Sequence, residues 1–252
     1  MSKINDTIKN ITELDYNLMA MAQSRLDNLT KPKDSLGRLE ELAKLIVGIT
    51  GKENPVLKNK VIFTFASDHG VAEEKVSAFP QEVTEQMVYN FIHGGAGVNV
   101  LARHIGAKVI VADLGVAGEL KIKNKSLKIK KINGGTKNMT KCPAMTQDEA
   151  IKSIETGIEI FEQELNHGID IIGIGEMGIA NTTASTAITA VWTKKAVEEI
   201  TGRGTGINNN GLENKIRVIK QALEINRPNP SDPIDVLSKV GGFEIGGLAG
   251  VI

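Results

Sequence analysis

Three short apolar runs, each ending in polar and glycine residues, constrain the fold of this chain most. They are "KVIFTFASDHG" at 60–70, "AKVIVADLGV" at Ala107–Val116 and "DIIGIGEMG" at Asp170–Gly178. Each run is rich in β-branched residues, which is typical of a strand that is covered on both faces of a parallel sheet. We therefore expect three buried strands at these positions.

Long helical stretches separate the three runs. Residues Val83–Gly106 predict either one helix or two helices broken at Gly94-Gly95, and residues 145–168 predict a longer helix. Thr146 and Glu149 have the spacing of a capping box at the start of that longer helix. Strands that alternate with helices of this length indicate parallel βαβ units. Ligands of such sheets bind outside the carboxyl ends of the strands.

The first part of the chain has a different pattern, because residues 1–55 are charged and helical. An apolar stripe with helical spacing predicts an amphipathic helix there, formed by Leu36, Leu39, Leu42, Ile46 and Ile49. Asp34 or Ser35 is the expected cap at its start. We predict two domains: residues 1–55 as the N-terminal helical part of a small domain, and residues 56–252 as an α/β domain. Asn226–Pro233 is expected to be a stiff connector within the α/β domain.

Composition excludes several classes of function. The 252 residues include 30 basic and 30 acidic side chains, so the net charge does not favour nucleic acid or a membrane surface as a partner. The single cysteine, Cys142, forbids an internal disulfide and fits a reducing cytoplasm. The N-terminus resembles no signal peptide, and no uninterrupted apolar run is long enough to span a membrane. The 26 glycines suit close backbone approach to a small ligand.

Glu176 is the first candidate functional residue, because it ends a predicted buried strand. Burial at the mouth of the sheet raises the pKa of a carboxyl group and suits it to act as a base. The same carboxylate could instead accept hydrogen bonds from a sugar hydroxyl, or cap neighbouring backbone amides. Asn181, Thr182 and Thr183 follow and are expected to cap the next helix. A helix start is also an anion site, so capping and substrate contact are compatible.

The segment "TGRGTGINNNGLENK" at 201–215 is the second candidate. Its alternating Gly202, Gly204 and Gly206 would let backbone N–H groups approach a phosphate, and Lys215 would add a positive charge. The spacing matches neither a P-loop nor a dinucleotide fingerprint, so a plain flexible turn is the alternative.

Two further patterns contain residue types that can carry chemistry. Asp68-His69 invites a metal interpretation, but the four histidines are scattered and have no metal-binding spacing, so we expect no metal and no cofactor. Phe79, Pro80, Val83 and Met87 could line a flat apolar pocket or belong to ordinary core. No nucleophile elbow is present, and Cys142 has no obvious base, so nucleophilic hydrolysis is unsupported.

The chain resembles nicotinate-nucleotide–dimethylbenzimidazole phosphoribosyltransferases, a family of cobalamin lower-ligand assembly. The resemblance covers nearly the whole chain in ordered segments. These are "LTKPKDSLGRLEELA", "FASDHGVAEEKVSAFPQEVTEQMVYNF", "GGAGVNVLARHIGAKVIVADLGV", "GTKNMTKCPAMT", "GIGEMGIANTT", "GRGTGINNNGLENK" and "DPIDVLSKVGGFEIGGLAGV".

The resemblance implies a Rossmann-like parallel sheet with helices on both faces, a small helical domain built from both chain ends, and a homodimer. It implies that nicotinate mononucleotide and 5,6-dimethylbenzimidazole react to give α-ribazole 5′-phosphate and nicotinate. The reaction is a displacement at the anomeric carbon with inversion. The pyridinium leaves without an acid, whereas the benzimidazole must lose a proton to a general base. Carboxylates stabilise the oxocarbenium-like transition state.

Site residues follow from the resemblance position by position. Glu176 matches a glutamate near ribose and base, followed by Met177 and Gly178, with Asn181 and Thr182 beyond them. The phosphate-side segment corresponds to Gly202, Gly204, Gly206 and Lys215. The region that lines the benzimidazole pocket corresponds to Phe79, Pro80 and Met87.

One departure from the family limits the functional prediction. The family's general base lies in a later Arg-Leu-Gly-Glu-Gly segment, which is not in this sequence. We therefore expect an incomplete small domain, an α/β domain truncated at its C-terminal end, and exposed apolar surface. The chain is then either a fragment or a naturally short protein. The alternative function is a catalytically impaired homologue that at most binds a nucleotide or phosphate.

Overall fold

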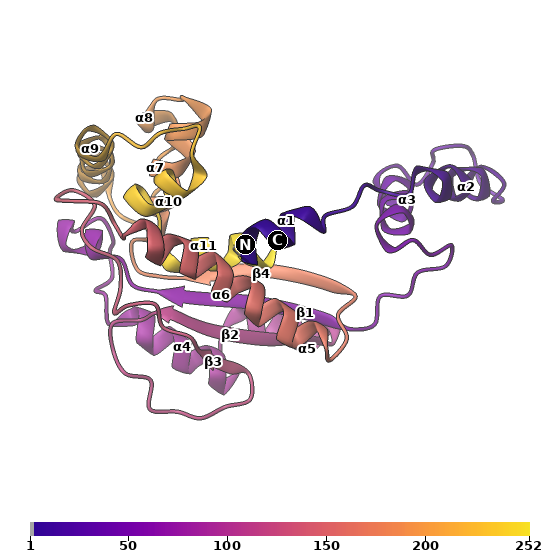
Figure 1. Ribbon diagram of the computed structural model, residues 1–252, viewed down its shortest axis with the longest axis horizontal. Coiled ribbons are helices and arrows are strands. Elements are labelled where there is room, and N and C mark those ends of the chain that lie inside the picture. The colour runs from indigo at the N-terminus through magenta and orange to yellow at the C-terminus, as the bar shows by residue number, and fades with distance from the viewer. Residues whose placement is uncertain (1–2) are drawn as a thin grey trace. The chain divides into compact units, whose positions relative to one another are not determined.

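The computed structural model describes residues 3–252, which form two compact units. One unit ends at Lys58, and the other spans Asn59–Ile252. The first unit contains α1 (Lys3–Lys9), α2 (Tyr16–Asp27) and α3 (Arg38–Thr50), drawn in indigo and violet in Figure 1. No helix within residues 3–252 combines the length and the apolar character needed to cross a membrane.

Helix α3 begins later than its sequence suggested. Its N-cap is Gly37, with no side-chain capping bond, so the expected cap at Asp34 or Ser35 is wrong. Glu40 explains the shift, because its carboxylate accepts the Leu36 N–H at 3.1 Å and pairs with Lys31 at 2.8 Å. These bonds tie the preceding turn to the first turn of the helix.

The apolar stripe of α3 is largely exposed. Leu36, Leu39, Leu42 and Ile49 are between 40% and 68% exposed. Helix α2 packs on a different face, since a Cβ placed on Gly48 would lie 2.6 Å from Met19 of α2. The spacing therefore predicted the helix, but it did not predict which face is buried.

A four-stranded parallel sheet lies at the centre of the second unit. Its strands are β1 (Lys60–Ser67), β2 (Ala107–Gly115), β3 (Leu127–Ile129) and β4 (Ile171–Met177), in the order β3-β2-β1-β4. The three predicted strands are confirmed, but the expected burial holds only for β1 and β2. Strand β4 lies at the edge of the sheet, and its Ile171 and Ile174 are 44% and 46% exposed. The sequence analysis missed β3, because three residues carry no readable periodicity.

Helices cover both faces of this sheet, which confirms the predicted α/β architecture (Figure 1). One face packs against α6 (Gln147–Leu165) and α11 (Phe243–Val251), and the other against α4 (Val83–His93) and α5 (Gly97–Ile105). Side chains of β2 point alternately to the two faces of the sheet. Ile110 and Leu114 belong to the apolar cluster with α6 and α11, whereas Val111 belongs to the cluster with α4.

Glycines set the close packing of α6 on α11. A Cβ on Gly157 would lie 1.9 Å from the Gly247 carbonyl oxygen, and a Cβ on Gly250 would lie 2.1 Å from the Ile154 carbonyl oxygen. A Cβ on Gly247 would also meet Phe65 of the sheet at 2.6 Å. The two helices therefore approach backbone to backbone, and the Phe65 side chain of the sheet packs on the backbone of α11, which fixes the position of that helix.

The remaining elements gather at the carboxyl ends of the strands, toward which the arrowheads in Figure 1 point. They are the 3₁₀ helix η1 (Gly70–Glu74), α7 (Asn181–Thr193), α8 (Val197–Ile200), α9 (Asn209–Asn226) and α10 (Pro233–Val240). The predicted break at Gly94 and the capping box of α6 are confirmed. Helix α10 was not predicted, although Asp232 caps it and Pro233 occupies its first turn.

Candidate functional site

A cavity of about 220 Å³ opens at the carboxyl end of β4. Six residues that the sequence predicted for the site line this cavity: Glu176, Met177, Gly178, Asn181, Thr182 and Gly204. Its other lining residues include Val76, Ser77 and Thr205. The strand end and the glycine-rich loop therefore share one cavity. Gly202, Gly206, Lys215, Phe79, Pro80 and Met87 do not line it.

Glu176 has an unusual electrostatic environment. Its side chain is open to solvent through the mouth of the cavity, although protein surrounds it on its other sides. The pKa of Glu176 is raised to about 7: partial burial raises it most, the Glu244 carboxylate adds to the increase, and His69 opposes both. Within residues 3–252 no hydrogen bond restrains the Glu176 carboxylate. The capping alternative therefore has no support, and the group is free to accept a proton.

Lys215 lies behind the wall of the cavity. Its side chain is buried, and its Nζ donates to Thr182 Oγ1 at 2.6 Å and to the Gly202 carbonyl at 3.2 Å. A Cβ on Gly204 would lie 3.3 Å from the same nitrogen. Burial lowers the pKa of Lys215. The ammonium group thus joins the glycine-rich loop to the first turn of α7, where exposed N–H groups and the helix dipole favour an anion.

The first turn of α7 differs from expectation. Asn181, Thr182 and Thr183 do not cap the helix, because Ala180 occupies the N-cap position with a left-handed φ of 74°. Asn181, Thr182 and Thr183 are therefore the first three residues inside the helix. The Asn181 side chain instead donates from Nδ2 to Glu244 Oε1 at 2.5 Å.

The loop that follows η1 meets the glycine-rich loop at Thr205. Its hydroxyl lies 3.0 Å from Ser77 Oγ and accepts the Ala78 N–H at 2.9 Å. Phe79, two residues beyond Ser77, is 54% exposed. Met87 of α4 packs in the same apolar cluster as Met177. The predicted benzimidazole-side residues therefore lie on elements next to the cavity without forming its wall.

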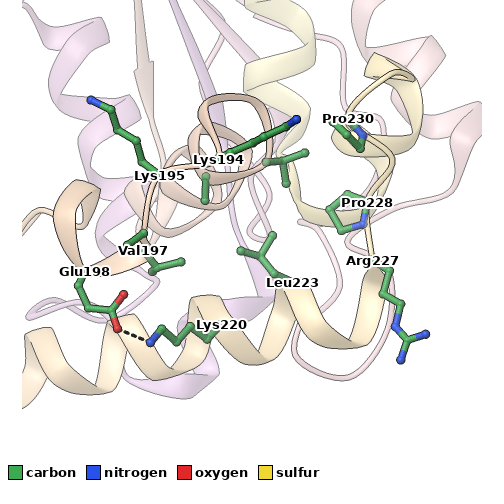
Figure 2. Close-up of a pocket in the computed structure, with 12 residues that line it drawn as sticks. Lys194, Lys195, Val197, Glu198, Lys220, Leu223, Arg227, Pro228 and Pro230 are labelled. Carbon is green, nitrogen blue, oxygen red and sulfur yellow. Dashed lines mark hydrogen bonds and ion pairs between the residues drawn. The ribbon is translucent and has the colours of Figure 1, made fainter.

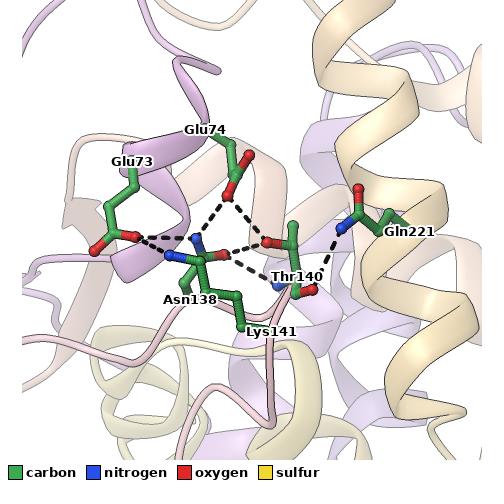
Figure 3. Close-up of polar contacts among 6 residues, drawn as sticks. All are labelled: Glu73, Glu74, Asn138, Thr140, Lys141 and Gln221. Atoms are coloured by element: carbon green, nitrogen blue, oxygen red, sulfur yellow. Dashed lines mark hydrogen bonds and ion pairs between the residues drawn. The ribbon is translucent and has the colours of Figure 1, made fainter.

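A polar network lies between η1 and α9, and Figure 3 shows part of it. Asn138 donates from Nδ2 to Glu74 at 2.8 Å and to Glu73 at 3.2 Å, and Thr140 donates to Glu74 at 3.1 Å. Asn214 of α9 donates to the Glu74 carbonyl at 2.8 Å. The network fixes η1 relative to α9, the helix that carries Lys215.

The site includes residues that the sequence analysis missed. Thr205 was passed over within the glycine run, and Glu244 was not singled out at all. His69 was considered only as a metal ligand, yet its Nε2 lies 2.9 Å from Glu244 Oε1. Within residues 3–252 no group of three or more His, Cys, Asp or Glu side chains could hold a metal ion.

A larger cavity of about 610 Å³ lies elsewhere, between α7, α8, α9 and the turn at Pro228–Pro230 (Figure 2). None of the predicted site residues lines it. Its one carboxylate, on Glu198, is paired with Lys220. Size alone would favour this cavity, but the smaller one is lined by Glu176, whose pKa is raised, by the first turn of α7 and by Gly204, so the smaller cavity is the candidate site.

Comparison with known proteins agrees with this fold. Residues 11–252 match a family model described as phosphoribosyltransferase. A protein of Geobacter sulfurreducens named nicotinate-nucleotide–dimethylbenzimidazole phosphoribosyltransferase is 53% identical over 252 residues, which cover 100% of this chain and 71% of that protein. A protein of the same name from Desulforudis audaxviator is 54% identical with the same coverage. The crystal structure of CobT from Thermus thermophilus matches with a TM-score of 0.89 and 40% identity, covering 93% of this chain and 70% of that one.

The fold and the family match together define a parallel α/β enzyme of the glycosyltransferase type. The chain belongs to the phosphoribosyltransferase family of these relatives.

Proposed function

We propose that this chain transfers the phosphoribosyl group of nicotinate mononucleotide to 5,6-dimethylbenzimidazole, giving α-ribazole 5′-phosphate and nicotinate in cobalamin biosynthesis. The observation that carries the proposal is the shared cavity of Glu176 and the glycine-rich loop, with buried Lys215 behind it. A base and an anion-binding wall are the two features that this reaction requires. The names of the relatives support the choice of substrates.

In the proposed reaction, a benzimidazole nitrogen attacks the anomeric carbon of the ribose as the bond to the nicotinate nitrogen breaks. The departing pyridinium takes the bonding electron pair and leaves as neutral-ring nicotinate, so it needs no acid. The benzimidazole must lose its N–H proton, and Glu176 accepts it in place of the family's later glutamate, which is not in this sequence. A pKa of about 7 suits this role, because a base is most effective when its pKa is near the working pH.

The other side chains bind and orient the substrates in this proposal. The backbone of Gly202, Gly204 and Gly206, together with Lys215 and Thr182, binds the ribose phosphate. Asn181, Met177 and Gly178 contact the ribose and the base. The benzimidazole ring packs against a second set of residues, Phe79, Pro80 and Met87.

Product formation tests the proposal directly. The purified chain is incubated with nicotinate mononucleotide and dimethylbenzimidazole, and α-ribazole phosphate is measured by chromatography. We expect product, and a decrease of roughly 10²- to 10⁴-fold in Glu176→Gln, because that is the usual contribution of a general base. Saturable nucleotide binding without any product would instead favour a binding protein, the alternative function. If the chain gives no product and binds no nucleotide, both the proposed function and the alternative are contradicted.

We also propose that the chain forms a homodimer in the cytoplasm. The family resemblance supports the dimer, and the single cysteine, Cys142, supports a reducing compartment. Light scattering of the purified chain measures its mass, and a mass equal to one chain at all concentrations would contradict the dimer.

A further inference from the structure

A buried group of three side chains lies behind Glu176, and two of them, His69 and Glu244, have no role in the reaction as described so far. His69 and Glu244 are 1% and 0% exposed, and Asn181 is 4% exposed. Glu244 Oε1 receives both contacts, from His69 Nε2 at 2.9 Å and from Asn181 Nδ2 at 2.5 Å. Such groups are costly to bury, so their presence beside the site calls for an explanation.

Strand register places this group on the side of the sheet that Glu176 faces. Glu176 is the partner of Phe65 in the parallel pairing of β4 with β1, so the two side chains point to the same face. Phe65 packs with Phe243 on that face, and Glu244 is the next residue of α11. Helix α11 therefore brings a carboxylate toward the end of β4.

Two close contacts hold the group against the cavity. A Cβ on Gly178, two residues after Glu176, would lie 3.1 Å from His69 Cδ2 and 2.3 Å from the Ser67 carbonyl oxygen. Asn181 lines the cavity together with Glu176 while it donates to Glu244. The imidazole thus packs directly under the loop that follows the proposed base.

We propose that His69 and Glu244 are positioning residues for Glu176: the buried pair sets the proton affinity of the Glu176 carboxylate, and Asn181 joins the pair to the cavity wall. The inference rests on the proposed role of Glu176 as the base. Glu244 Oε2 supports it, because this oxygen is buried without a hydrogen-bond partner among residues 3–252. His69 and Asn181 therefore engage only one of the two carboxylate oxygens, Oε1.

The electrostatics agree with this arrangement. After burial, the Glu244 carboxylate is the next cause that raises the pKa of Glu176, and His69 lowers it. Burial lowers the pKa of His69, but Glu244, Glu176 and Asp68 outweigh burial and raise it. Lys215 of α9 lies behind Thr182 in the same cavity wall. Coupling between two such groups is reciprocal, so each should respond when the other loses its charge.

The substitution Glu244→Gln tests the pair with little change in shape. It removes a negative charge that outweighs the opposing charge of His69. If His69 then becomes neutral, both influences on Glu176 vanish; if it stays charged, only the lowering influence remains. The pKa of Glu176 should therefore fall from about 7 toward the ordinary value of 4.5 in either case. The substitution Glu244→Asp keeps the charge and should keep the pKa raised.

Carbon-13 NMR of the glutamate carboxyl groups measures this pKa, with the Glu176 signal assigned as the one absent from Glu176→Gln. The matched control is Glu164→Gln, because Glu164 is also buried and paired, with Lys108 and Lys128. Lys108 lies at the opposite end of the sheet, so this control should leave the pKa of Glu176 unchanged. An unchanged pKa in folded Glu244→Gln would overturn the proposal.

A reciprocal measurement does not depend on Glu244→Gln folding. Glu176 is exposed in the cavity, so Glu176→Gln should fold, and it should lower the pKa of His69 as seen in the imidazole proton signals. An unchanged His69 titration would also contradict the coupling. Both titrations are independent of turnover. If no α-ribazole phosphate is formed while both shifts are observed, the proposed function fails and the buried pair stands.

Discussion

Glu176 links the chemistry of single residues to the pH dependence of stability. Its pKa rises from 4.5 to about 7 on folding, so the folded state binds the proton more tightly than the unfolded chain does. The stabilising contribution is complete below pH 4.5 and is lost as the pH rises through about 7. His69 changes in the same direction, because its pKa is also raised in the folded state.

We therefore predict that Glu176→Gln flattens the pH dependence of stability. The wild-type free energy of unfolding should decrease from about pH 5 to about pH 8, and the variant should lose less over the same range. Solvent reaches the Glu176 side chain, so the difference will be small. Urea denaturation at both pH values measures it. A wild-type slope equal to that of the variant would show that Glu176 is not perturbed.

Lys215 provides a second test at the residue scale. Lys215→Met removes a buried ammonium group, and burial already disfavours its charged form, as its lowered pKa shows. The free energy of unfolding should therefore fall by less than about 1 kcal/mol or rise. The affinity for nicotinate mononucleotide should weaken roughly 10- to 150-fold, as expected for loss of one charge-assisted hydrogen bond. Lys220→Met, on the exposed face of the same helix, is the control and should leave the affinity unchanged. Titration calorimetry decides between these outcomes.

At the scale of elements, the contact between α6 and α11 is the most sensitive to side-chain size. Gly157→Val should destabilise the protein by about 1–3 kcal/mol or more, since no space exists for even one added carbon. Gly97→Ala, in α5, is the matched control, because nothing lies within 4 Å of its Cβ position. That change should stabilise by about 0.4–1 kcal/mol or be neutral. Thermal melts of the two variants measure the contrast, and equal melting temperatures would contradict the close approach.

Some elements could be predicted from sequence because their signals are local. The β-branched runs of β1, β2 and β4 and the capping box of α6 need only neighbouring residues. The start of α3 could not be predicted, because an ion pair of Glu40 with Lys31 decides it. The predicted cap of α7 is wrong for a similar reason, because the Asn181 side chain forms a long-range hydrogen bond to Glu244 and Ala180 takes the N-cap position.

The same limit applies to the site as a whole. The end of a predicted strand indicated Glu176, and the family resemblance added the glycine-rich segment; Glu176 and Gly204 line one cavity. The pairing of His69 with Glu244 joins residues 175 positions apart, and no periodicity connects them. Its only trace in the sequence is Gly242, where a Cβ would lie 2.5 Å from both Glu244 and His69.

The division into two units leads to a prediction about the whole molecule. Every residue of the candidate cavity, and of the apolar clusters that surround the sheet, lies in the unit Asn59–Ile252. Residues 59–252 expressed alone should therefore unfold cooperatively and bind nicotinate mononucleotide within a few-fold of the whole chain. A folded 59–252 segment without nucleotide binding would show that the first unit contributes to the site.

The first unit should behave in the opposite way when it is separated. Helix α2 buries none of its residues, and α3 buries Glu40, Val47 and Gly48, while the apolar stripe of α3 is exposed. So little buried apolar surface cannot offset the conformational entropy of ordering a segment of this length. Residues 1–58 alone should therefore show weak helical circular dichroism and no cooperative melt. A sharp melt at high dilution would mean that α2 and α3 form a stable pair without a further surface against the exposed stripe.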